Sequence, residues 1–99
     1  MDLKRHKEAK ALLRKTVPVA RRVLGENDET TLRARHYYAR VLYQDKSSTF
    51  DEFREAVATF EDTARIARRV LGGAHPLVPL MEKTWRAVRE QLPSLREGK

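Results

Sequence analysis

Three pairs of adjacent carboxylates are the residues of this chain whose types and spacing come closest to acid–base chemistry. They are Asp28–Glu29, Asp51–Glu52 and Glu61–Asp62. Two of the pairs stand at the start of predicted helices, where a carboxylate complements the positive end of the helix dipole, so a structural role explains them. No candidate nucleophile, Gly-rich phosphate loop or second converging group accompanies them. We therefore predict that the chain is not an enzyme.

The three histidines do not form a metal site. His6, His36 and His75 belong to three different predicted segments, with no pair spaced i, i+4 and no supporting carboxylates. We expect His75 to cap the helix that follows it. Cysteine is absent, which excludes disulfides and thiolate ligands and fits a reducing compartment. We expect no metal and no cofactor.

A net charge of +7, with 21 basic and 14 acidic side chains, favours anionic partners. No apolar run approaches the ~20 residues of a membrane span, and the N-terminus lacks the apolar core of a secretory signal, so a cytoplasmic location is expected. A basic face near the N-terminus keeps open an alternative function, the binding of a polyanion such as nucleic acid or anionic lipid. Its members are Lys7, Lys10, Arg14 and Arg21. The charge does not recur 47 residues later, and a solvated helix face is the favoured interpretation.

The hexapeptide ARRVLG occurs twice, at 20–25 and again at 67–72, an offset of 47 residues. Extending the alignment upstream places 7–25 over 54–72 with ten identical positions in nineteen. A fixed-period repeat indicates a repeated structural unit, so the two segments should have the same fold.

Each copy has the apolar periodicity of a helix that ends at a glycine. Thr49 and Glu52 have the spacing of a capping box, and Gly72 supplies the positive φ that stops the helix. Pro18 predicts a kink or short break near residue 17. We predict an all-α fold of antiparallel helix-turn-helix repeats in one domain, 1–92. Its four helices are expected at about 2–24, 29–44, 50–71 and 77–92, followed by a frayed tail, 93–99, after Pro93.

This pattern resembles tetratricopeptide repeats, an α-solenoid family, and specifically the long-repeat subtype found in kinesin light chains. The residues that carry the resemblance are VLGENDETTLRARHYYARVLY, FREAVATFEDTARIARRVLG and VLGGAHP. The family asparagines are replaced by His36 and Tyr37. Arg86 stands where a small residue is usual. The resemblance implies a second helix of one repeat, one complete repeat and the first helix of another, with five extra residues in the loop before residue 50.

The resemblance implies a non-catalytic scaffold that binds a peptide or protein in a groove lined by the first helix of each pair, and the basic side chains of that groove favour an acidic partner. The groove residues it implies are Arg33, His36, Arg40, Tyr43, Gln44 and Lys83. The two incomplete repeats also suggest self-association, in which the last helix of one molecule packs on the first helix of another. The candidates for that contact are Leu13, Val17, Val78, Met81 and Val88. A piece of a longer array and a designed assembly unit remain open interpretations.

Overall fold

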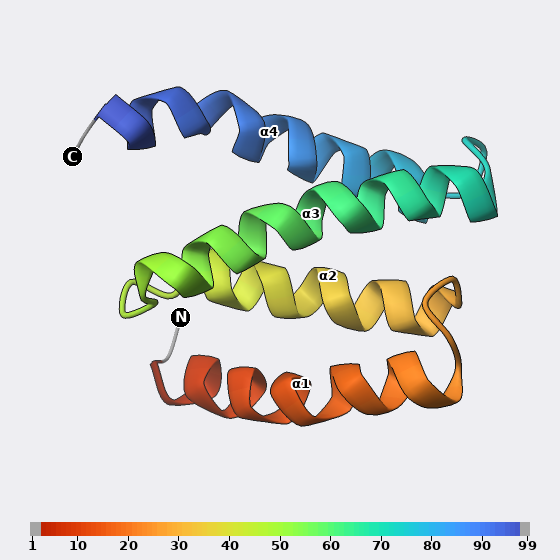
Figure 1. Cartoon of the computed structure of the whole chain (residues 1–99), viewed down its shortest axis with the longest axis horizontal. Helices are drawn as coiled ribbons and strands as arrows, with labels where there is room; N and C mark the ends of the chain where they lie inside the picture. The colour runs from red at the N-terminus through yellow and green to blue at the C-terminus, as the bar shows by residue number, and fades with distance from the viewer. Residues whose placement is uncertain (1–2, 98–99) are drawn as a thin grey trace.

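The computed structural model describes residues 3–97, and these form four α-helices with no strand. The helices are α1 (Leu3–Val23), α2 (Glu29–Gln44), α3 (Phe50–Leu71) and α4 (Leu77–Glu97). They lie side by side in chain order and run back and forth, so that each packs mainly on its sequence neighbours (Figure 1). The predicted all-α repeat fold is confirmed.

The helix ends are fixed by the residues that the sequence marks. Thr49 and Glu52 form the capping box, with the Thr49 side chain accepting from the Glu52 amide at 3.1 Å and the Glu52 side chain accepting from the Thr49 amide at 3.0 Å. Gly72, with φ of 84°, ends α3, and Gly25, with φ of 93°, follows α1. His75 Nδ1 accepts from the Leu77 amide at 3.1 Å and so caps α4 as expected.

The short break near residue 17, expected as an alternative to a kink, is absent, and so is the expected helix end at Pro93. α1 continues through Pro18 without a break. Pro18 is exposed, so its ring displaces no packed side chain, and the helix keeps its hydrogen bonds on both sides of the missing N–H. α4 likewise continues through Pro93 to Glu97, so the prediction of a frayed tail from residue 93 was wrong up to residue 97. A proline removes one backbone donor, and the residues after it still have amides of their own to donate.

The core consists of two clusters along the stack. One joins α1, α2, α3 and α4 through residues that include Val17, Leu42, Phe60 and Val88. The other joins α2, α3 and α4 around Leu32, and half-buried Trp85 packs against both clusters. Tyr38, which the repeat aligns with Trp85, is buried.

α1 and α3 are copies of one helix, but they are covered differently. α3 packs on α2 and on α4, whereas α1 packs on α2. Thr16 and Thr63 illustrate this, because each donates its hydroxyl to the carbonyl four residues earlier, at 2.8 and 2.9 Å. Thr63 is completely buried, yet Thr16 is exposed. One side of the repeated helix is therefore core in α3 and surface in α1.

Candidate protein-binding surfaces

The exposed face of α2 carries four side chains that follow one another at helical spacing: Arg33, Tyr37, Arg40 and Gln44. We call these four residues the α2 row. They include three of the predicted groove residues. His36, also predicted for the groove, is only 1% exposed and cannot contact a ligand there. That part of the prediction was wrong, because position 36 is turned toward α3, where its ring lies 5.5 Å from the ring of Phe60, centroid to centroid. Tyr37 takes its place on the surface.

The buried His36 ring is kept neutral. Neither ring nitrogen has a hydrogen-bond partner among the described residues. Burial lowers the pKa of His36 from 6.5 to about 4, and the nearby charge of Arg40 contributes in the same direction. His36 therefore acts as a core residue, and the charge that the α2 row presents comes from its arginines.

The two arginines of the row differ in their partners. Arg33 forms an i, i+4 ion pair with Glu29 at 2.7 Å, and the other oxygen of Glu29 lies 3.1 Å from His75 Nε2. Arg40 forms no ion pair with any residue in the described range. Arg40 thus presents the uncompensated charge of the row, with the exposed Tyr37 ring three positions before it.

The remaining predicted groove residues lie apart from the row. Tyr43 is half-buried, its ring stacks on Phe53 with centroids 5.3 Å apart, and its hydroxyl donates to Gln91 of α4. Burial raises the pKa of Tyr43. Lys83 is exposed on α4, at the position equivalent to His36. On α2 that position is covered by α3, so Lys83 lies on the end of the stack.

The predicted self-association residues are already used inside the molecule. Val17, Val78, Met81 and Val88 are all buried, at 8% exposure or less, and Leu13 packs against the first core cluster. The prediction was wrong for these five positions, because the stripes they form face the neighbouring helices of the same chain. The exposed apolar residues of α1 are different ones: Leu12, Val19 and Val23.

Most of the basic face proposed for polyanions is paired within the chain. Lys10 and Arg14 of α1 reach Glu52 of α3 at 2.7 and 2.9 Å, and Arg21 binds Glu26 at 2.7 Å. The Lys10 ammonium is the main reason that the pKa of Glu52 falls to about 2. Lys7 alone of that face is left without an ion pair in the part of the chain described. These contacts weaken the polyanion alternative.

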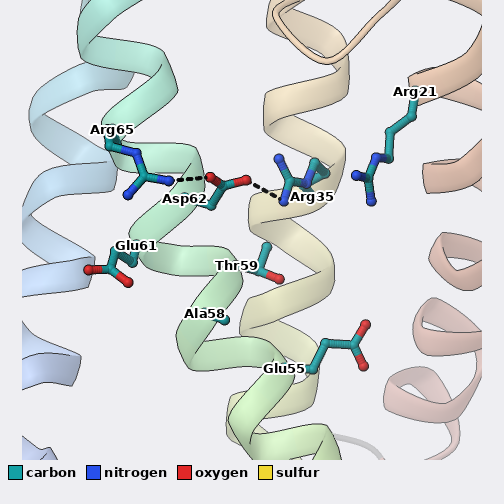
Figure 2. A pocket seen from close by; sticks show the side chains of 8 residues that line it. All are labelled: Arg21, Arg35, Glu55, Ala58, Thr59, Glu61, Asp62 and Arg65. Carbon is teal, nitrogen blue, oxygen red and sulfur yellow. Dashed lines mark hydrogen bonds and ion pairs between the residues drawn. The ribbon is translucent and has the colours of Figure 1, made fainter.

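Figure 2 shows a hollow of about 450 Å³ whose floor and walls carry charges of both signs. Arg35 of α2 and Arg65 of α3 approach the two oxygens of Asp62, each at 2.8 Å, and the Arg35 side chain is 9% exposed. Arg21, Glu55, Ala58, Thr59 and Glu61 complete the lining. The paired charges hold α2 to α3. A signal for Arg35 exists in the sequence, since it shares a face with Leu32 and Leu42, where a cation needs an acidic partner.

A second hollow, of about 280 Å³, lies between α3 and α4. The guanidinium of Arg68 forms an ion pair with the carboxylate of Glu82 across it. This pairing lowers the pKa of Glu82 and raises that of Arg68. Among residues 3–97, no group of three or more histidine, cysteine or acidic side chains is placed to hold a metal ion. Within the same range, no helix combines the length and apolar character needed to cross a membrane.

Comparison with protein families decides what kind of repeat this is. The family model described as Tetratricopeptide repeat matches residues 1–29 and 48–77, two spans whose starts are separated by the 47 residues of the internal repeat. The chain belongs to the tetratricopeptide-repeat family. The matched model is of the kinesin-light-chain-like subtype, as the sequence motifs indicated. No curated protein and no solved structure matches the chain. Tetratricopeptide repeats generally mediate protein–protein interactions.

Proposed function

We propose that this tetratricopeptide-repeat chain is a non-catalytic scaffold that binds an acidic peptide segment of another protein on the α2 row. The observation that carries the proposal is the exposure of Arg33, Tyr37 and Arg40 on one helix face, with Arg40 lacking an internal counterion among the described residues. An arginine can bind a carboxylate through two parallel hydrogen bonds, and an exposed tyrosine adds apolar contact beside it.

The neighbouring helix supports this surface. Tyr43 and Gln91 join α2 to α4 by a hydrogen bond, and Val88 of α4 lies in the same core cluster as Leu42 of α2. α4 therefore contacts α2 near the C-terminal end of α2, whereas α2 packs mainly on α1 and α3. Leu80 of α4, 47% exposed, is aligned with Arg33 by the repeat and offers an apolar contact for a peptide that spans both helices.

The test is a selection of 12-residue peptides from a displayed random library, followed by affinity measurements on the purified chain. We expect acidic peptides to be enriched. The double substitution Arg33→Glu with Arg40→Glu should weaken the selected peptides at least tenfold, which corresponds to about 1.4 kcal/mol. Arg54→Glu with Arg89→Glu is the matched control, since both of those arginines are exposed and outside the row.

Two outcomes would count against this function. One is equal loss of affinity in the control, which would show that net charge alone attracts the peptides. The other is unchanged affinity of the Arg33, Arg40 variant. Salt separates the remaining alternative, because a polyanion ligand such as single-stranded DNA loses affinity linearly on a log–log plot, with a slope near the number of phosphates contacted.

A further inference from the structure

The outward side of α1 is an apolar stripe bordered by cations. Leu12, Val19 and Val23 are 65%, 47% and 68% exposed, and Thr16 lies between them at helical spacing. We call these four residues the α1 stripe. Arg5 lies on the same side about two turns before Leu12, and Lys15 and Arg22 lie along one edge. All three are exposed. Apolar side chains in a row on a small domain indicate a contact surface.

The internal repeat shows what kind of element covers such a stripe. The α3 positions equivalent to Thr16 and Val19 are Thr63 and Ile66, which are 0% and 9% exposed. On the same side of α3, Asp62 is tied to Arg35 of α2. In the complete repeat, then, the middle of this side of the helix faces the antiparallel helix that precedes it, whereas Val70, the equivalent of Val23, is 41% exposed. A helix laid against the α1 stripe would occupy the corresponding place.

α2 contributes a second contact surface for a helix that lies on the α1 stripe. Met81 and Val88 of α4 are 0% and 4% exposed, and they belong to the core clusters shared with α2. Their equivalents on α2, 47 residues earlier, are Ala34 and Val41, which are both only half-buried. A helix on the α1 stripe would therefore also cover Ala34 and Val41. The surface extends over two helices.

The charges around the stripe identify the occupant. Helix α1 contains eight lysines and arginines and one acidic residue, so its formal charge of +7 equals that of the whole chain. At one position where α3 has a carboxylate that binds a cation of α2, α1 has a cation instead. Asp62, which binds Arg35 of α2, is aligned with Lys15. A helix that covers α1 as α2 covers α3 therefore needs a carboxylate at the position where α2 has Arg35.

We propose that the α1 stripe is a docking site for an acidic amphipathic helix of a partner protein, which completes the first repeat and places a carboxylate on Lys15. This site is separate from the α2 row. A second copy of the chain is a poor occupant through α1, because two helices of charge +7 repel each other. It is also poor through α4, whose end face carries Lys83 and Arg86. Arg86 stands at the position of Ala39, which is 0% exposed because α3 lies directly on it.

The chain itself supplies the probe, because α2 is the helix that covers the equivalent side of α3. The acidic probe is a fluorescein-labelled peptide of residues 27–44 with Arg33→Glu, Arg35→Glu and Arg40→Glu. The matched probe keeps arginine at position 35. Fluorescence anisotropy with the full chain should give saturable binding of the acidic probe with a Kd of roughly 10–100 µM. The matched probe should bind at least fivefold more weakly.

Three variants of the full chain make the test specific. Lys15→Glu should reverse the preference, so that the matched probe binds better than the acidic one. Leu12→Ser with Val19→Ser should weaken the acidic probe at least tenfold. Val70→Ser, which changes an apolar side chain of similar exposure, 41%, on α3, should leave it unchanged. Helicity measured by circular dichroism should be equal in all of these variants.

Several results would overturn the proposal. Absence of saturable probe binding up to 1 mM is one, and binding whose preference does not reverse in Lys15→Glu is another. The chain could also be sedimented with vesicles of phosphatidylcholine and phosphatidylserine. Vesicle binding that requires Leu12 and is tighter than probe binding would assign the stripe to a membrane surface instead. If light scattering gives a dimer mass, and Leu12→Ser with Val19→Ser abolishes the dimer, the stripe is assigned to a second copy of the chain. Arg33→Glu with Arg40→Glu in the chain should leave the reversal of preference by Lys15→Glu in place, so this test and that of the α2 row fail independently.

Discussion

At the scale of single residues, His36 sets how stability depends on pH. Its pKa is about 4 in the folded chain and near 6.5 when the chain unfolds. Between these values the unfolded state binds one more proton than the folded state, so stability falls as the pH decreases from 6.5 to 4. We expect His36 to account for a loss of about 2–3 kcal/mol between pH 7 and 4.5. Urea denaturation across this range measures it.

His36→Leu is the matched variant, because it keeps the volume and removes the titrating ring. Its unfolding free energy should be nearly level between pH 7 and 5. Below about pH 4.5 both proteins should lose stability together, because the lowered pKa values of Glu52, Asp45 and Glu82 all act there. An NMR titration that finds the His36 ring protonated at pH 6 in the folded chain would contradict this account.

Of the predicted groove residues on α2, the exposure expected from the sequence is correct for Arg33, Arg40 and Gln44 and wrong for His36. The spacing of Arg33, Arg40 and Gln44 placed them on the surface, and the structure agrees. The sequence could not decide whether His36 or Tyr37 is exposed, because both positions lie next to Arg33 and Arg40 on the helix surface. The choice depends on how far α3 wraps around α2, which is a tertiary contact. Burial of an imidazole without a hydrogen bond is contrary to the usual preference and is not predictable from residue type.

At the scale of the helix, the repeat allows a clean test of Pro18. Pro18 lies inside α1, where it lacks the amide that would donate to the carbonyl of Arg14. Pro18→Ala restores that donor at an exposed site and should raise the free energy of unfolding by about 1–3 kcal/mol. Ala11→Pro, an exposed position on the same side of α1, is the reciprocal control and should destabilise by about 3 kcal/mol. Equal stability of Pro18→Ala and the parent chain in urea denaturation would show that α1 contributes little to global unfolding.

Helix ends were predictable where a side chain or a glycine makes the end locally. Thr49 with Glu52, Gly72 and His75 act within four residues of the positions they cap, so residue type and spacing suffice. Prolines were the weak signal, since both Pro18 and Pro93 lie inside helices. A proline lowers the stability of one turn, and the packing of the rest of the helix decides whether the helix continues.

At the scale of the whole molecule, the two ends of the stack differ. The α2 face that lies on α3 contains Leu32, His36 and Ala39, which are nearly inaccessible. The equivalent α4 residues are Pro79, Lys83 and Arg86, all exposed. The stack thus has a polar end at α4 and an apolar side at α1. The 47-residue offset predicted the fold, but only this comparison of burial between equivalent positions shows which end is closed.

This asymmetry predicts that the parent chain is a monomer in solution and that two substitutions change it. Lys83→His with Arg86→Ala gives α4 the residues that α2 has at these positions, and so removes two cations from its end face. α4 of one molecule could then lie on the α1 stripe of the next, with Lys15 against Glu82 as Arg35 lies against Asp62. Such a contact is head-to-tail, so it should produce oligomers that grow with concentration.

Sedimentation velocity across a concentration series distinguishes the outcomes. The parent chain should keep one sedimentation coefficient, whereas the Lys83→His, Arg86→Ala variant should show a weight-average value that increases with concentration. Adding Lys15→Glu to that variant should restore the monomer, because it places a carboxylate against Glu82, whereas adding Lys46→Glu, an exposed charge in the turn before α3, should not. If the variant still assembles after Lys15→Glu is added, the copies contact each other at a different surface. If the parent chain already assembles, the cations on α4 do not prevent contact at that end of the stack.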